Sequence, residues 1–218
     1  MTTSSLYRSS PLFRFITNAY ALLAVATLVA CGTHLKPTIA DVSERAVEVV
    51  EAGVGDATVV FESGLGNDWA PWDDVASEVA GRARVFAYSR PGYGGSDPSE
   101  APRTATRIVE DLRALLTARG LVPPYILVGH SFGGTYMELF AKAHPEEVVG
   151  LVLVDSRHRD FTAACQSAGL WQSMHGALAH EAVHGEQIVF EGASHNLEID
   201  RAHEVAEVIL SLVPASKN

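Results

Sequence analysis

Apolar positions along the chain follow two periods, one typical of buried strands and one typical of amphipathic helices. Continuous apolar runs at residues 125–128 and 150–155 predict strands that are buried on both faces. Residues 104–120 instead place apolar side chains at helical spacing, and a second helix is expected to begin near Ser131 and end at Pro145. This alternation predicts an α/β domain with a mostly parallel sheet and helices on both faces.

The remaining segments are assigned by the same criteria. Two β-rich runs, residues 46–51 and 57–62, flank a Gly-Val-Gly-Asp turn and predict an antiparallel hairpin. The other expected elements are a helix at 72–80, a strand at 84–89, a helix at 170–183, a strand at 187–191 and a closing helix at 200–213.

The N-terminal segment has a different composition from the rest. It carries Arg8 and Arg14 but no acidic residue, and then an apolar run that ends at Cys31. These features predict a secretory signal, and the run is shorter than the ~20 residues of a membrane span. The ending "LVAC" resembles a bacterial lipobox, which implies cleavage before Cys31 and acylation of that residue. An uncleaved anchor and an ordinary signal with a chance cysteine are the alternatives.

Length and charge limit the other possibilities. The chain has 218 residues, and a net charge of −10 without any basic run argues against a nucleic-acid partner. We expect a signal at residues 1–30, a tether at 31–43 and a single domain at 44–218. The lipobox resemblance implies a protein of the bacterial cell envelope that is exported and held at a membrane by its lipid anchor.

The segment "GHSFGG" places one serine between a predicted strand and a predicted helix. Gly129, Ser131 and Gly133 fit the pattern G-x-S-x-G, in which the serine occupies a strained turn and exposes its hydroxyl above the sheet. The N–H of Phe132, at the positive end of the new helix, is a candidate donor to an oxyanion. This context predicts that Ser131 is a nucleophile.

With these residues, the chain resembles the α/β-hydrolase fold, in its lipase/esterase-like branch. The resemblance covers roughly residues 45–160 and 186–213. In "FESGLGNDWAPW", Ser63-Gly64 stands where the family has a His-Gly pair, and the resemblance assigns a second oxyanion donor to the N–H of Leu65. In "AYSRPGYGGSDPS", Ser89 replaces the family's usual aspartate.

The general base and its acid come from later in the chain. "GASHNLEID" resembles the segment that presents the base, so His195 is expected to take the proton of Ser131. The family's usual site for the acid is missing, because the chain between Asp155 and His195 is short. The resemblance therefore implies that a cap is absent and that the seventh-strand region is deleted. Asp155, at the end of the strand that corresponds to the family's sixth, is the best substitute, with Asp160 and Glu191 as weaker alternatives.

These residues together predict a carboxylesterase that acts through an acyl-enzyme on small or surface-presented esters and needs no cofactor. Trp69 and Trp72, with Phe132, Tyr93 and Leu197 as further candidates, are expected to line the substrate site, and an ordinary core position is the equal alternative for each. A catalytically impaired lipoprotein that binds a ligand or partner is the alternative. The motif "HEAVH" at 180–184 also fits a zinc hydrolase, but Gly185 follows at once, so we expect no metal site there.

Overall fold

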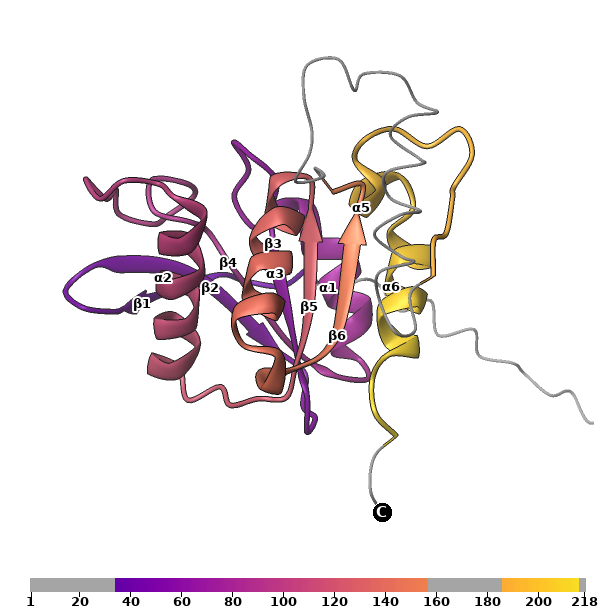
Figure 1. The fold of residues 1–218 in the computed structure, drawn as a ribbon, viewed down its shortest axis with the longest axis horizontal. Coiled ribbons are helices and arrows are strands. Elements are labelled where there is room, and N and C mark those ends of the chain that lie inside the picture. Colours follow the sequence, from indigo (N-terminus) through magenta and orange to yellow (C-terminus); the bar gives the residue numbers. More distant parts are fainter. Residues whose placement is uncertain (1–33, 157–185, 216–218) are drawn as a thin grey trace, which may run out of the picture. The chain divides into compact units, whose positions relative to one another are not determined.

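Six strands form one sheet in the order β1-β2-β4-β3-β5-β6 (Figure 1). The computed structural model describes residues 34–156 and 186–215, which all belong to the unit Gly32–Asn218. The strands are β1 (Thr38–Asp41), β2 (Ala46–Ala52), β3 (Thr58–Glu62), β4 (Arg84–Tyr88), β5 (Tyr125–His130) and β6 (Val148–Val154). β4, β3, β5 and β6 pair in parallel, whereas β1 and β2 join antiparallel at one side.

The central strands are buried on both faces because helices cover each side. In β3, Val59 and Phe61 pack into one hydrophobic cluster, while Val60 between them packs into the other. The first cluster includes residues of α1 (Asp73–Ala80) and α6 (Ala202–Ser211), and the second includes residues of α2 (Ala105–Ala118) and α3 (Phe132–Ala143). The shorter helices are η1 (Ala70–Trp72), η2 (Pro145–Glu147) and α5 (Leu197–Asp200). The predicted α/β class, with a mostly parallel sheet between helices, is confirmed.

The predicted hairpin of residues 46–51 and 57–62 is wrong. These segments do form β2 and β3, but β4 lies between them and pairs with both. All five residues of β3 are buried, as expected for a central strand with a neighbour on each side. The local turn signal could not reveal this, because the strand that separates β2 from β3 comes later in the chain.

The predicted tether of residues 31–43 also needs correction, since part of it belongs to the domain. Thr38–Asp41 forms β1, which pairs with β2 along its whole length, and Ala40 is buried. This four-residue strand is too short to give a clear periodic signal.

The predicted strand at 187–191 is likewise wrong. Residues 186–190 form no regular structure, and Ile188 and Val189 are about half exposed, at 46% and 51%. The expected helix at 170–183, and most of the stretch in which we expected a deletion, lie outside the described residues.

Parallel pairing brings the carboxyl ends of β3, β5 and β6 to one edge of the sheet. Glu62 is level with Gly129, and His130 is level with Val154. In Figure 1 the arrowheads of β5 and β6 point to this edge, and α5 lies beside it. In open α/β sheets, ligands bind at the carboxyl ends of the strands, so a functional site is expected at this edge.

Candidate active site

Ser131 occupies the corner between β5 and α3 in a backbone conformation that non-glycine residues rarely adopt. Its φ is 52° and its ψ is −119°. Its N–H donates to the carbonyl of Val154 at 3.1 Å, which ties the corner to the end of β6. A Cβ at Gly133 would lie 2.3 Å from the carbonyl oxygen of Glu62, so only glycine allows α3 to approach β3 this closely. The strain at Ser131 is thus imposed by packing on both sides, as in a nucleophile elbow.

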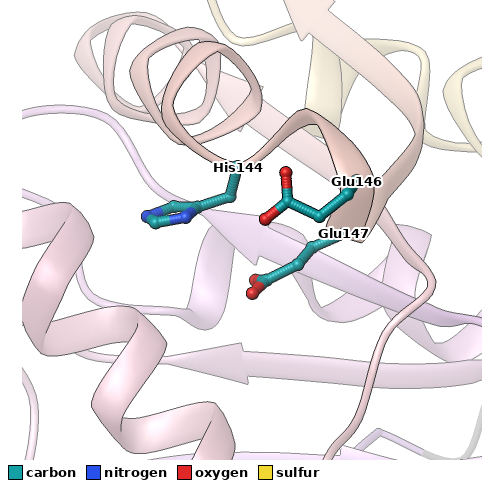
Figure 2. Close-up of side chains that lie close together, drawn as sticks. All are labelled: His144, Glu146 and Glu147. Atoms are coloured by element: carbon teal, nitrogen blue, oxygen red, sulfur yellow. The ribbon is translucent and has the colours of Figure 1, made fainter.

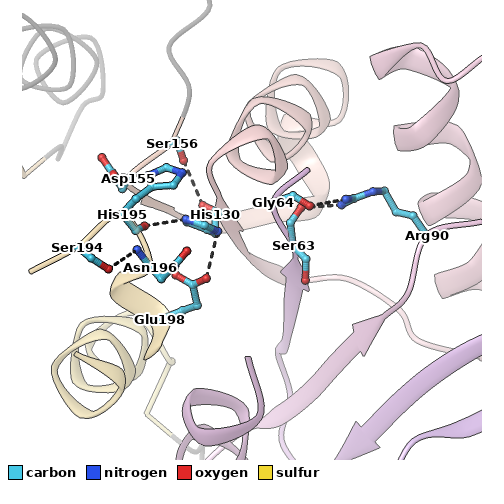
Figure 3. Close-up of polar contacts among 11 residues, drawn as sticks. Ser63, Gly64, Arg90, His130, Asp155, Ser156, Ser194, His195, Asn196 and Glu198 are labelled. Carbon is cyan, nitrogen blue, oxygen red and sulfur yellow. Dashed lines mark hydrogen bonds and ion pairs between the residues drawn. The ribbon is translucent and has the colours of Figure 1, made fainter. Parts of the chain in front are cut away.

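The loop before α5 brings His195 to Asp155, 40 residues earlier in the chain. The Nδ1 atom of His195 lies 2.5 Å from Oδ2 of Asp155, which follows directly after β6 and has a φ of 39° (Figure 3). The hydrogen bond to Asp155 raises the pKa of His195 above its ordinary value, while partial burial opposes the rise. Because Nδ1 is held by the carboxylate, the neutral ring has its lone pair on Nε2, as a general base requires.

His130 connects this pair to the corner. Its Nε2 lies 2.8 Å from the carbonyl oxygen of His195, and the centres of the two imidazole rings are 4.7 Å apart. Ser131 is the next residue in the chain. The structure therefore brings Asp155 and His195 into contact, and it places Ser131 at the same sheet edge through its neighbour His130.

The loop after β3 lies against the same corner. A Cβ at Gly64 would be 3.5 Å from the Cβ of Ser131. On the other side of the loop, Arg90 donates to the carbonyl oxygens of Ser63 at 2.6 Å and Gly64 at 2.5 Å (Figure 3). In a trans peptide the N–H points opposite to the C=O. The N–H of Leu65 therefore points away from Arg90, which suits the predicted role as an oxyanion donor.

Arg90 is itself held by buried groups that the sequence analysis missed. It forms an ion pair with Glu62, and the Tyr88 hydroxyl donates to the other carboxylate oxygen at 2.5 Å. The side chains of Glu62 and Arg90 are only 1% and 7% exposed. Burial raises the pKa of Glu62, and the charge of Arg90 opposes that rise. The sequence did offer a signal for this buried ion pair, because the mostly apolar strand β3 ends in a glutamate, Glu62.

The second predicted oxyanion donor, Phe132, is the first residue of α3. Its N–H belongs to the first turn of the helix, where the helix dipole is positive. The two candidate donors thus come from different segments, the loop after β3 and the start of α3.

The prediction that Trp69 and Trp72 line the substrate site is wrong. They are 6% and 0% exposed, and both belong to the core cluster that includes α1 and α6. The ring of Trp72 packs 5.1 Å from that of Phe61. The sequence suggested a site role because both tryptophans follow the loop that carries Leu65. In the structure they instead pack between the sheet and the helices α1 and α6.

Leu65 instead lines a pocket of about 130 Å³, to whose walls Ser131 and His195 do not contribute. Tyr93, one of the further candidates, lines it together with Leu65, Tyr88, Arg90 and Tyr136. The guanidinium carbons of Arg90 and Arg103 lie 5.3 Å and 5.2 Å from the centre of the Tyr93 ring, so cation–π contacts hold that ring in place. Leu65 is thus shared by the pocket and the predicted oxyanion site.

A second buried polar pair adjoins the triad. Nδ1 of His130 lies 3.2 Å from Oε1 of Glu198 on α5, within ion-pair distance, and the two side chains are 3% and 1% exposed (Figure 3). Burial raises the pKa of Glu198 to about 7, and burial lowers the pKa of His130. The sequence analysis predicted no catalytic or binding role for His130 or Glu198.

Potential metal ligands gather at a different place. The motif at 180–184 lies outside the described residues. Within the described ranges, the group that could hold an ion is His144, Glu146 and Glu147, at and after the C-terminal end of α3 (Figure 2). α3 has 12 residues and Ser131 precedes its first residue, so this group is about 18 Å from the nucleophile along the helix axis. Glu147 is also already paired with Arg113.

Comparison with known proteins gives a family for this arrangement. A family model described as the alpha/beta hydrolase fold matches residues 57–193. The chain is 36% identical over 103 residues to the uncharacterized protein YqjL of Bacillus subtilis, which covers 47% of this chain and 41% of that protein. It is 31% identical over 101 residues to an AB hydrolase superfamily protein of Gibberella zeae, covering 44% of this chain and 31% of the relative.

Two solved structures extend the comparison to the fold. A predicted CIB-like hydrolase from Thermoplasma acidophilum superimposes with a TM-score of 0.68 at 17% identity, over 81% of this chain and 96% of that one. An epoxide hydrolase variant from Vigna radiata superimposes with a TM-score of 0.52 at 26% identity, over 67% and 46%. The chain spans less than half the length of the first curated relatives that it matches.

The buried Arg90–Glu62 pair provides a test of this part of the structure. Arg90→Met leaves the Glu62 carboxylate buried without its partner, so we expect the free energy of unfolding to fall by about 3–5 kcal/mol. Adding Glu62→Gln should restore most of the loss, because the uncompensated charge is then gone. Urea denaturation measures both. Arg113→Met, which breaks a more exposed arginine–glutamate pair, is the control and should cost about 1 kcal/mol or less; equal losses at the two sites would contradict the assignment.

Proposed function

This chain belongs to the alpha/beta hydrolase fold family, and we propose that it is a serine hydrolase that cleaves small carboxylic esters through an acyl-enzyme. The observation that carries the proposal is the 2.5 Å contact between His195 and Asp155, beside the strained corner of Ser131. Forty residues separate the pair in sequence, and strain in a serine between strand and helix is characteristic of nucleophiles.

In this mechanism the Ser131 hydroxyl attacks the ester carbonyl, and Nε2 of His195 accepts its proton. Asp155 holds Nδ1–H and stabilises the imidazolium that forms. The carbonyl oxygen becomes negative as the tetrahedral intermediate forms, and the N–H groups of Leu65 and Phe132 stabilise it. His195 then returns the proton to the leaving alkoxide, and a water molecule hydrolyses the acyl-enzyme by the same steps.

The size of the pocket beside Leu65 supports small esters as substrates. At about 130 Å³ it is well below the ~300–1,000 Å³ of sites for drug-sized ligands, so it suits a short acyl or alkyl group. Its walls carry the rings of Tyr88, Tyr93 and Tyr136. A short apolar substituent placed there would leave the reacting carbonyl on the Ser131 side of the loop.

Epoxide opening, the activity named for one structural neighbour, does not suit this nucleophile. Attack on an epoxide by a serine oxygen would leave an ether, which water does not readily cleave, and the enzyme would be trapped. Attack on an ester leaves another ester, which the same His195 can hydrolyse. A serine nucleophile can therefore turn over repeatedly on esters but not on epoxides.

The triad is tested with a fluorophosphonate probe and p-nitrophenyl acetate. We expect the probe to label the wild type and not Ser131→Ala, and we expect His195→Gln and Asp155→Asn to lower kcat by about 10²–10⁴-fold. Ser211→Ala and Asp74→Asn, both on the surface, are the controls and should retain activity. A folded wild type that neither takes up the probe nor hydrolyses the ester would support the alternative, an impaired hydrolase-fold protein that binds a ligand or partner.

The pocket is tested by enlarging it. Tyr136→Ala removes a ring from its wall, so the ratio of kcat/KM for hexanoyl over acetyl esters should rise about tenfold, because added methylene groups can then be buried. Steady-state kinetics on a series of p-nitrophenyl esters measures the ratio. Val122→Ala, which trims an exposed apolar residue, should leave it unchanged, and an unchanged ratio in Tyr136→Ala would place the acyl group elsewhere.

We also propose that Cys31 carries the lipid anchor and that the protein works at a membrane of the bacterial cell envelope. Residues 1–33 lie outside the described part, and within the described ranges no helix is long and apolar enough to cross a membrane. Under this proposal, the lipid on Cys31 attaches the protein to the membrane.

Fractionation of expressing bacteria tests the anchor. We expect the wild type in the membrane fraction and Cys31→Ala released from it or left unprocessed, because one residue supplies the site of both acylations. Cys165→Ala is the matched control and should fractionate like the wild type. Equal membrane association of all three proteins, with the N-terminal segment retained, would instead indicate an uncleaved anchor.

A further inference from the structure

The buried pair of His130 and Glu198 is not needed for the proposed triad chemistry, yet it lies directly behind it. His130 precedes the nucleophile, and its ring lies 4.7 Å from that of the base, His195. Glu198 comes three residues after His195, on α5. Two polar side chains that are 3% and 1% exposed are costly to bury unless they interact.

The hydrogen bonds define where the protons lie. Nε2 of His130 is 2.8 Å from the carbonyl oxygen of His195, and a carbonyl only accepts, so Nε2 carries a hydrogen. In a neutral ring Nδ1 then has a lone pair. Oε1 of Glu198 lies 3.2 Å from that atom, and among the described residues neither of the two buried atoms has a hydrogen bond of good geometry to any other group. The contact is favourable only when one proton is shared between the two groups.

We propose that His130 and Glu198 form a one-proton pair that positions the base, because the pair keeps His130 in the tautomer that donates to the His195 carbonyl. This inference rests on the proposed serine hydrolase function. His130 and Glu198 are positioning residues, since they act through His195 rather than on the substrate.

The neutral form of the pair is the one that suits catalysis. Burial favours it, with the pKa of Glu198 raised to about 7 and the pKa of His130 lowered. His195 becomes an imidazolium when it takes the Ser131 proton, and a charged His130 ring so close would repel it. A protonated Glu198 that donates to Nδ1, which has no other partner within the described ranges, would satisfy that atom without placing a charge on His130.

Loss of the shared proton should weaken the hydrogen bond by which His130 holds the backbone of His195. A carboxylate facing the lone pair of Nδ1 is repulsive, and the ring can relieve this by moving its hydrogen from Nε2 to Nδ1, which breaks the bond to the His195 carbonyl. His195, Asp155 and Asp200 also act electrostatically on Glu198: the positive form of His195 favours ionisation, and the two aspartates oppose it. The alkaline side of the activity profile should therefore report the pair, while the acidic side reports His195.

The pH dependence of p-nitrophenyl acetate hydrolysis tests this in Glu198→Gln. The glutamine amide donates to Nδ1 at every pH, so we expect the acidic limb of kcat/KM to remain and the alkaline decline of the wild type, up to tenfold per pH unit, to disappear. In Glu198→Leu, which has no donor, kcat should fall about tenfold with little change in KM. Glu204→Gln on the exposed face of α6 is the matched control and should keep the wild-type profile.

A second measurement does not depend on activity. The pKa of Glu198 is raised above the ordinary value of 4.5, so the folded state binds this proton more tightly than the unfolded state does. The free energy of unfolding should then decrease as the pH rises from about 4.5 through 7, and less so in Glu198→Gln. Identical alkaline limbs or identical pH dependences of stability in the two proteins would overturn the proposal. A wild type without any esterase activity would refute the proposed function, and the stability comparison would still decide whether the pair holds a proton.

Discussion

Parallel pairing of β3, β5 and β6 is the constraint on which the site depends. It sets the carboxyl ends of three strands side by side, and each end supplies one part of the site. β3 leads into the loop of Leu65, β5 into Ser131, and β6 into Asp155. The backbone of Ser131 is bonded to Val154, and the close approach at Gly133 brings α3 against β3. The register of the sheet therefore sets the relative positions of Leu65, Ser131 and Asp155.

Buried polar side chains fix this geometry at two places. Arg90, neutralised by Glu62, donates to carbonyls of the loop after β3, and His130 bonds the carbonyl of His195. In both cases a side chain grips the backbone of a loop rather than the substrate. Loops are the most mobile parts of a fold, and catalysis requires positions fixed within about 0.5 Å. Burying polar groups is unfavourable, and here the buried groups fix the loops that carry the proposed functional groups.

The sequence predicted the strand–serine–helix corner because glycine spacing and apolar periodicity are local. It also paired Asp155 with His195, by resemblance and chain order. It could not show that β4 separates β2 from β3, since strand order is a long-range property. Nor could it distinguish buried tryptophans from pocket aromatics. At Ser89, where the family has an aspartate, the structure shows Glu48 of the neighbouring strand within 2.6 Å of the serine hydroxyl, a substitution visible only in space.

The position of Asp155 has a consequence for how the proposed activity would be lost. Ser131 and Asp155 follow adjacent strands, so the proposed nucleophile and acid are held by one ladder of backbone hydrogen bonds. The proposed base, His195, lies on the loop before the four-residue helix α5, and its bonds to Asp155 and His130 are made through the side chains of those residues. Activity would then require the loop with His195 and α5 to stay docked on the sheet. Moderate heating would detach this segment and abolish activity at a temperature at which the sheet is still folded.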